Sequence, residues 1–341
     1  MRIGTMFSIK DVSVHDDGYG LYSMRVSYDY DIDRIVGRGI TDDDALSKAI
    51  MKEAIPFMPA GRPSHGFGCS AFCLKDTSDG VLTGRNYDFR HDTSAMMVHC
   101  RPKGGYGSVA FADLENLSAN DPKRFRGRIA SLAAPFVCLD GINEKGVSIA
   151  VLALDSEPTY QDTGRPRIST TLIIRAVLDK ASSTEEAFEI FRQYDMFAAS
   201  GHDYHFYVCD HDGDARVFEY DCDTDPRSLV SVPADAVSNF FNIHEDKVLP
   251  HQRNGVYGHG RERYDTILGK MAEYEGMITE DIGWDILASV TRYPDPEDVT
   301  SDTKWSILFN NSRCTAEIAF HRRLDERYTF SASDGRILKG C

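Results

Sequence analysis

Several features that define other protein classes are missing from this 341-residue sequence. No cysteine pair has the Cys-x-x-Cys spacing of zinc ribbons and thiol redox motifs. The longest apolar run, near residues 129–139, is too short to span a bilayer. No internal repeat occurs, and no stretch is rich enough in glycine, serine or proline to form a long linker. These absences argue against zinc-ribbon, membrane-spanning and repeat proteins.

Basic residues are also too few for a protein that binds polyanions. The chain has 38 Lys and Arg against 53 Asp and Glu, a net charge of −15. This charge repels phosphate backbones and anionic lipid surfaces, so we expect neither a nucleic-acid partner nor a membrane partner. The first sixteen residues lack the apolar segment of a secretion signal, which predicts a cytoplasmic location. The hydrophobic share of 42% is typical of a folded globular protein.

The eight cysteines are scattered, which favours reduced thiols over a disulfide framework. The nearest approach to a metal-ligand set is His202, His205, Cys209 and His211. The run HFYVCD at 205–210 alternates like a strand, which would divide the side chains of this set between two faces. We therefore expect no metal and no cofactor.

The order of predicted elements indicates an α+β fold. Residues 20–28 read as a strand pair, and a helix is expected over 42–54 with Thr41 as its N-cap. Six prolines and glycines then mark residues 56–68 as a loop. Beyond the loop, strands are expected at 69–75, 80–89, 146–154, 205–210, 215–220 and 304–309, and helices at 169–180, 185–194, 262–275 and 280–290.

Two local signals refine this prediction. Asp-Gly pairs at 79–80 and 212–213 are typical of tight hairpin turns. Ser182 and Glu185 have the spacing of a capping box at the start of the second helix of the 169–194 pair. Strand runs separated by helical pairs favour helical layers packed on antiparallel sheets over a regular βαβ alternation.

The most informative residues lie just after the predicted loop. Cys69 follows Gly68 at the start of the first strand, and Arg85 and Asp88 lie on the next strand, which the first Asp-Gly turn folds back beside it. A thiol, a cation and a carboxylate can then meet. A cysteine at a strand start is more often structural, and Arg85 with Asp88 would also fit an ordinary ion pair, so the residues alone leave both interpretations open.

The segment GCSAFCLKDTSDGVLTGRNYDF, residues 68–89, resembles the start of the choloylglycine hydrolase family of N-terminal-nucleophile hydrolases. The resemblance continues in the same order as far as about residue 320. It includes DGINEKGVSIAVLAL at 140–154, DYHFYVCDHDGDARVFEYD at 203–221, AVSNFFN at 236–242, RERYDTILGKM at 261–271 and TKWSILF at 303–309. It implies a four-layer αββα sandwich, which agrees with the element order.

The resemblance also implies a mechanism in which the chain cuts itself before the nucleophile. Residues 1–68 would then be a propiece or N-terminal segment, cut from a 69–341 catalytic domain between Gly68 and Cys69. The freed α-amine would serve as the base for the Cys69 thiol. Arg85 would hold the thiolate, and Asp88 would orient the α-ammonium.

Two more catalytic residues follow from the resemblance. Asn239 would donate to the oxyanion, and Arg263 would complete the electrostatic frame, with Arg292 as the alternative arginine. Ala153 aligns where relatives place an asparagine or a tyrosine, so one oxyanion donor would have to be replaced.

Apolar residues beside the site predict the substrate. Phe67, Phe240 and Phe241 would line an acyl pocket near Cys69, and Ala153 is placed with them among the substrate-binding positions. Any of these aromatic side chains could instead pack in the core. The expected function is hydrolysis of linear non-peptide amides, such as N-acyl amides, acylated antibiotic nuclei or conjugated bile acids. An acyltransferase and a non-catalytic binding relative are the alternatives, and the resemblance implies a homo-oligomer.

Overall fold

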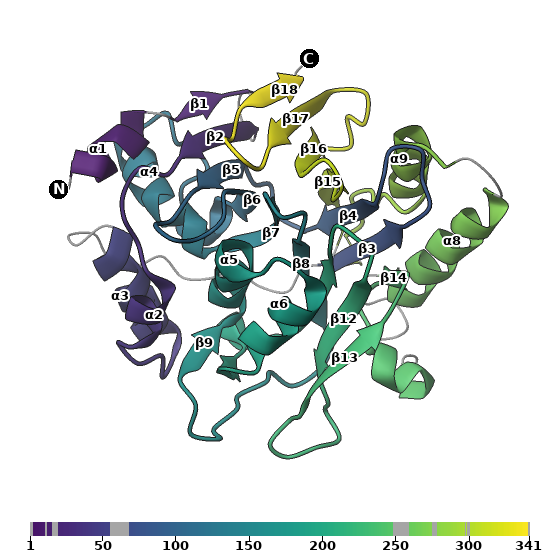
Figure 1. The fold of residues 1–341 in the computed structure, drawn as a ribbon, viewed down its shortest axis with the longest axis horizontal. Helices are drawn as coiled ribbons and strands as arrows, with labels where there is room; N and C mark the ends of the chain where they lie inside the picture. The colour runs from purple at the N-terminus through teal and green to yellow at the C-terminus, as the bar shows by residue number, and fades with distance from the viewer. Residues whose placement is uncertain are drawn as a thin grey trace.

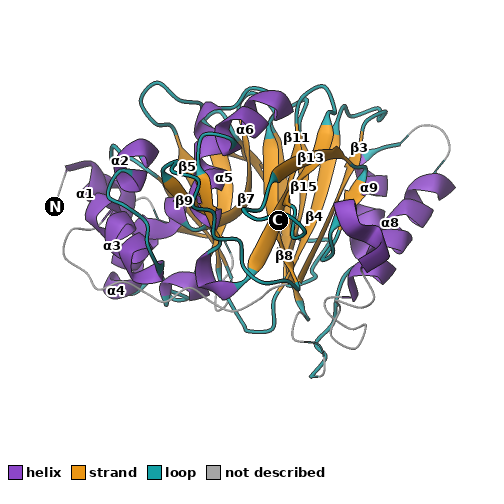
Figure 2. Cartoon of the chain, turned by 90° about the horizontal axis from the view of Figure 1, so that it is seen from below, coloured by secondary structure: helices purple, strands orange, loops and turns teal. Residues whose placement is uncertain are grey.

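Two β-sheets packed face to face form the centre of the computed structural model, which describes residues 3–10, 12–15, 20–54, 68–247, 259–274, 278–296, 298 and 301–339. Figure 1 shows the course of the chain through both sheets. Figure 2 shows the strands in the middle, with α8 and α9 on one side and the other helices on the opposite side.

The larger sheet has nine strands, and β2 and β5 are its one parallel pair among the described residues. In spatial order the strands are β1 (Ser13–Val14), β2 (Leu21–Arg25), β5 (Ala95–Cys100), β6 (Ser108–Asp113), β7 (Cys138–Asn143), β8 (Ser148–Leu154), β11 (Asp203–Cys209), β12 (Ala215–Tyr220) and β13 (Leu229–Pro233). Strand β8, with the sequence SIAVLAL, is buried on both faces, as an apolar run in a central layer should be.

The second sheet has seven antiparallel strands. In spatial order they are β14 (Ala236–Val237), β3 (Gly68–Leu74), β4 (Leu82–Asp88), β15 (Thr303–Asn310), β16 (Thr315–Phe320), β17 (Arg327–Ser331) and β18 (Ile337–Lys339). A small parallel pair, β9 (Arg167–Ser169) and β10 (Asp195–Phe197), lies apart from both sheets. The predicted turn at Asp79-Gly80 connects β3 to β4, and Gly80 has a φ of +96°, a left-handed value that favours glycine.

Helices cover the outer faces of both sheets. Helices α5 and α6 pack on the nine-stranded sheet, and α8 and α9 pack on the seven-stranded sheet, which gives the predicted αββα layers. The helices are α1 (Ile3–Lys10), α2 (Ile32–Val36), α3 (Asp43–Ala54), α4 (Phe125–Ala130), α5 (Thr170–Lys180), α6 (Thr184–Phe191), α8 (Gly260–Glu273) and α9 (Glu280–Ser289). The short 3-10 helices are η1 (Glu115–Leu117), η2 (Ser131–Phe136), η3 (Ala199–Gly201) and η4 (Asn242–Lys247). None of the described helices combines the length and the hydrophobicity that a membrane span requires.

The predicted α+β class is confirmed, and the six predicted strands and the predicted helices lie within a few residues of their expected positions. Two predicted caps are wrong by one residue. The side chain of Asp42, not Thr41, accepts from the backbone of Ala45 at the start of α3. At α6, Ser183 is the N-cap and accepts from Glu186, whose carboxylate accepts in return from Ser182. In both places two adjacent residues have side chains that can cap the helix. The residue at which the helix begins decides which of them does so.

The segment before Cys69 contributes to the folded core. Strand β2 pairs with β5, and Leu21, Tyr22 and Met24 are buried. The predicted range 20–28 contains one strand, β2, and not a strand pair, because its antiparallel partner β1 lies before the range and residues 26–28 continue as coil. The predicted 56–68 loop and Phe67 lie outside the described residues, except for Gly68, which begins β3.

Candidate active site

The β3–β4 hairpin directs Cys69 and Arg85 into the space between the two sheets. In the antiparallel register, Cys69 lies opposite Tyr87 and Ala71 lies opposite Arg85, so all four side chains share one face. Arg85 Nη2 lies 3.3 Å from the Cys69 sulfur and donates to the carbonyl of Val151, also at 3.3 Å, in the other sheet. One guanidinium therefore connects the thiol to the opposite sheet.

A carboxylate of the opposite sheet balances the charge of Arg85. Asp140, at β7, lies 2.9 Å from Arg85 Nε, and both side chains are fully buried. Trp305 donates its indole N–H to the same carboxylate at 3.1 Å, and the guanidinium also faces the ring of Tyr87. Burial raises the pKa of the Asp140 carboxyl to about 6, although Arg85 opposes this increase. Asp140 and Trp305 lie in segments that carry the family resemblance, but their partnership with Arg85 was not predicted.

The thiol of Cys69 is inaccessible to solvent. Its residue is fully buried, and burial raises the pKa of the thiol to about 12. The positive charges of Arg85 and Arg263 both lower this pKa, and the negative charge of Asp88 raises it. Arg85 therefore opposes the effect of burial on the pKa of the thiol, and burial is the larger effect.

Asp88 lies on the opposite face of the hairpin. It lies three positions after Arg85, and side chains alternate along a strand, so Asp88 points towards the helical layer. There its carboxylate accepts from Arg263 of α8 at 3.0 Å and from Thr303 at 2.6 Å. Burial raises the pKa of the Asp88 carboxyl, and Arg263 opposes that change.

Asn239 connects Cys69 to the Asp88–Arg263 pair. Strand β14 pairs with β3, and this pairing brings the residues that follow β14 beside the start of β3. The Asn239 side-chain oxygen accepts from the Cys69 backbone N–H at 2.8 Å and from Arg263. Its amide nitrogen donates to the carbonyl of Ala153 at 2.6 Å, and the hydroxyl of Ser238 donates to the Cys69 carbonyl.

The structure therefore brings Cys69, Arg85, Asp88, Asn239 and Arg263 into one continuous network. Asn239 holds the Cys69 nitrogen, a contact that the resemblance had implied for Asp88. The backbone carbonyl of Ala153 orients the Asn239 amide. This role does not depend on the side chain, so the alanine in the sequence did not indicate it. The odd separation of Arg85 and Asp88 was the sequence signal for their opposite faces.

The remaining predicted residues make contacts outside this network. Arg292 pairs with Asp298 at 2.9 Å, while Arg263 is the arginine that donates to Asn239. Phe240 is buried with its ring edge-on to Tyr264 of α8, which accounts for its burial without a substrate. Phe241 is half-buried, 6.0 Å from the ring of His244.

Two of the four residues considered as metal ligands, His205 and Cys209, have partners of their own. His205 pairs with Glu219 of β12 at 2.8 Å, and the sulfur of Cys209 lies 3.4 Å from that of Cys73. Both side chains are therefore used in separate contacts within the sheets.

Part of the sequence matches a family model, and the fold is similar to that of solved structures. Residues 69–224 match the family model of the linear amide C-N hydrolases, choloylglycine hydrolase family. Penicillin V acylase from Agrobacterium tumefaciens is similar in structure, with a TM-score of 0.58 and 16% identity over 78% of this chain and 87% of that chain. Two variant structures of conjugated bile acid hydrolase from Clostridium perfringens have TM-scores of 0.58 and 0.59. They are 14% and 13% identical over 80% of this chain and 96% of theirs, so these likenesses show the fold.

Proposed function

Because the chain belongs to the choloylglycine hydrolase family of linear amide C-N hydrolases, we propose that it is an autoprocessed cysteine amidase with Cys69 as its nucleophile. The observation that carries this proposal is the pair of contacts on Cys69. Arg85 lies 3.3 Å from its sulfur, and the Asn239 oxygen accepts from its backbone nitrogen. After cleavage before Cys69, the same nitrogen becomes a free α-amine next to the thiol.

Autoprocessing supplies the catalytic base. The Cys69 sulfur attacks the Gly68 carbonyl, the Cys69 nitrogen takes a proton and leaves, and water opens the resulting thioester to a Gly68 carboxylate. Gly68 has no Cβ to obstruct the attack. An α-amine has an ordinary pKa of about 7.7–8.0, so at neutral pH it can accept the thiol proton.

The same groups serve the amide substrate. The thiolate, stabilised by Arg85, attacks the amide carbonyl, and the amine leaves with a proton from the α-ammonium. An asparagine amide carries two N–H donors, one of which binds the Ala153 carbonyl. The other can donate to the oxyanion, a contact worth about 2.7–4 kcal/mol in a comparable hydrolase. Water then opens the thioester and releases the acid.

Intact mass spectrometry of the purified chain tests this proposal. We expect a mass that corresponds to cleavage between Gly68 and Cys69, and release of acid from N-acyl amides. Cys69→Ala should stay uncut and inactive, while Cys314→Ala, which removes a half-buried thiol elsewhere, should be cut like the parent. Full-length chain that turns over amides after prolonged incubation would rule out autoprocessing.

The proposed substrate is an amide with an apolar acyl part and a small polar amine. If the acyl chain is buried, each methylene contributes about 0.8 kcal/mol, so kcat/KM for N-acyl glycines should rise several-fold per carbon until the pocket is full. Phe241→Ala should flatten this increase if the side chain lines the pocket. A flat series in the parent enzyme, or preferential cleavage of peptides, would contradict the proposed substrate class.

Acyl transfer uses the same thioester but ends on an amine instead of water. Product analysis with and without an added amine separates the two reactions. Release of acid that is unchanged by added amine supports the hydrolase, whereas a new amide at the expense of the acid would identify a transferase.

A further inference from the structure

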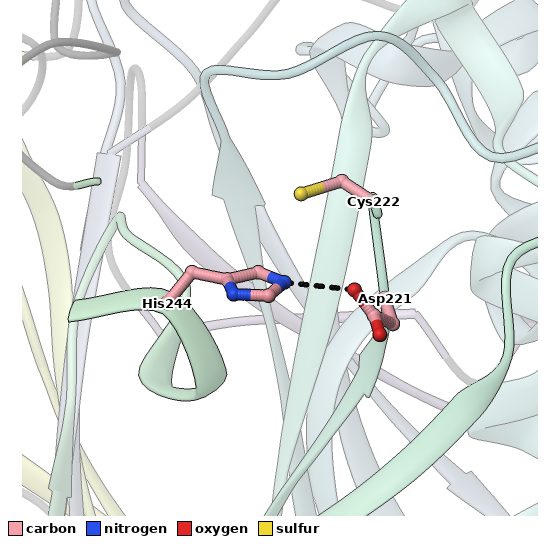
Figure 3. Close-up of side chains that lie close together, drawn as sticks. All are labelled: Asp221, Cys222 and His244. Atoms are coloured by element: carbon pink, nitrogen blue, oxygen red, sulfur yellow. Dashed lines mark hydrogen bonds and ion pairs between the residues drawn. The ribbon is translucent and has the colours of Figure 1, made fainter. Parts of the chain in front are cut away.

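A second cluster of reactive side chains lies outside the proposed active site. It joins the turn after β12 to the 3-10 helix η4, and it consists of Asp221, Cys222 and His244 (Figure 3). Their ligand atoms all lie within 4.8 Å of one another. No other group of three or more such residues with this proximity occurs in the described part of the chain.

The backbone directs these side chains towards one point. Asp221 and Cys222 begin the turn that follows β12, and the Asp221 carboxylate also accepts from the backbone of Asp223 at 2.9 Å. His244 has φ −135° and ψ 50°, outside helical values, within η4. Its Nε2 lies 2.7 Å from Asp221 and 3.8 Å from Asp223 Oδ2. Figure 3 shows the imidazole and the Cys222 sulfur facing the same space.

We propose that Asp221, Cys222 and His244 bind a zinc-class divalent cation, with Asp223 as the fourth ligand. The donor set is one thiolate, one imidazole and two carboxylates. Thiolate and imidazole ligands favour zinc and similar transition metals over Mg²⁺ and Ca²⁺, which prefer oxygen alone. Four ligands also match the tetrahedral coordination of structural zinc sites.

The local charge and exposure suit such a cation. The turn carries three acidic residues within five positions, Asp221, Asp223 and Asp225, around the cysteine. The side chains of His244 and Asp221 are 16% and 21% exposed, so a hydrated ion can reach them from solvent. Binding requires that the Asp221–His244 contact lengthen to admit the ion, and it releases the thiol proton.

A cation at this site would attach the segment that follows Asn239 to the end of β12. Residue 244 is five positions beyond Asn239, and the same segment is already held by Glu219, which accepts from the backbones of Asn242 and Ile243 at 2.8 and 3.0 Å. The cation adds a second attachment between β12 and η4. Its role is structural, and the existence of the site does not depend on the proposed amidase function.

Titration of the purified protein with Co²⁺ tests the site, because a cobalt–thiolate bond gives a charge-transfer absorption that water and carboxylate ligands do not. We expect one Co²⁺ per chain with this absorption, and Zn²⁺ should displace it. Loss of even an outer-shell partner weakens metal affinity about 10–100-fold, so Cys222→Ser and His244→Gln should weaken binding at least about 100-fold. Circular dichroism confirms that each variant is folded.

Matched cysteine variants show which thiol binds the metal. Cys314→Ala and Cys69→Ala should keep the absorption, since Cys314 is the other half-buried thiol described and Cys69 is the nucleophile. Zn²⁺ should also slow amide hydrogen exchange across residues 242–247 in the parent but not in Cys222→Ser. A parent chain without the thiolate absorption, or an absorption that persists in Cys222→Ser, overturns the proposal. Neither readout requires turnover, so failure here leaves the amidase proposal untouched.

Discussion

The two faces of strand β4 use the same kinds of polar contact for different purposes. On the face between the sheets, Arg85 pairs with Asp140 and Tyr87 donates to Asp113, so both side chains connect to the opposite sheet. On the helical face, Asn86 donates to the Leu287 carbonyl of α9, and Asp88 pairs with Arg263 of α8. The hairpin thus connects all the layers around Cys69 except the outer helices of the nine-stranded sheet.

The difference lies in the contacts that each face makes with Cys69. The inner face places a cation against the sulfur of Cys69, and the helical face holds Asn239 against its nitrogen through Arg263. Changes on the inner face should therefore alter thiol reactivity. Changes on the helical face should alter stability and the position of the nitrogen, and they should shift the pKa of the thiol less than changes at Arg85 do.

The largest effect is expected at Arg263. Arg263→Met leaves the Asp88 carboxylate buried without its cation, and breaking a buried ion pair in this way costs about 3–5 kcal/mol. The free energy of unfolding in urea should fall by that amount. Asp88→Asn in the same chain should recover part of the loss, because it removes the unpaired charge.

Arg261→Met is the matched control on the same helix. Arg261 pairs with Asp265 and is 42% exposed, and such surface pairs contribute about 0–1 kcal/mol. If the two single substitutions lower the unfolding free energy equally, the helical face does not depend on the Asp88–Arg263 pair.

The second prediction concerns pH on the inner face. Burial raises the pKa of the Asp113 carboxyl to about 6, above the ordinary value of about 3.9. The folded state therefore binds this proton more tightly than the unfolded state. Its contribution to stability is complete below about pH 4 and is lost as pH rises to about 6, a loss of about 3 kcal/mol.

Urea unfolding at pH 4, 5, 6 and 7 measures this loss. Asp113→Asn keeps an acceptor for Tyr87 but cannot titrate, so the parent should lose stability relative to the variant over that interval. A constant difference between the two proteins would show that Asp113 is ionised throughout.

The sequence was sufficient for the hairpin because its information is local. The Asp-Gly turn and the alternation of side chains place Arg85 and Cys69 on one face of adjacent strands. Because positions 85 and 88 are an odd number apart, the sequence also indicates that Asp88 faces the helices. The resemblance to the family had instead implied that Asp88 lies next to the Cys69 nitrogen. Helix ends were less predictable, since neighbouring residues such as Thr41 and Asp42 can both cap.

Non-local partners could not be predicted in the same way. Asp140 reaches Arg85 from the other sheet, and Ala153 acts through its backbone carbonyl, which no residue pattern reveals. The parallel pairing of β2 with β5 joins segments about seventy residues apart, and it makes part of the expected propiece a strand of the core. Such contacts depend on how the sheets pack.

The smallest effect, and the most specific to the inner face, is expected at Arg85. In cut protein, Arg85→Met should raise the apparent pKa of the Cys69 thiol, since a neighbouring cation lowers the pKa of an acid by about 1–3 pH units. At a fixed pH below that pKa, the rate of alkylation by iodoacetamide should then fall by at least about tenfold. The pH dependence of alkylation measures both quantities.

Tyr87→Phe is the control for this last comparison. It lies two residues along the same face and removes only the hydroxyl that donates to Asp113, so it leaves the charge next to the sulfur unchanged. Its alkylation profile should match that of the parent. An unchanged profile in a folded Arg85→Met variant would mean that the guanidinium only connects the two sheets through Asp140, and the two faces of β4 would then both be structural.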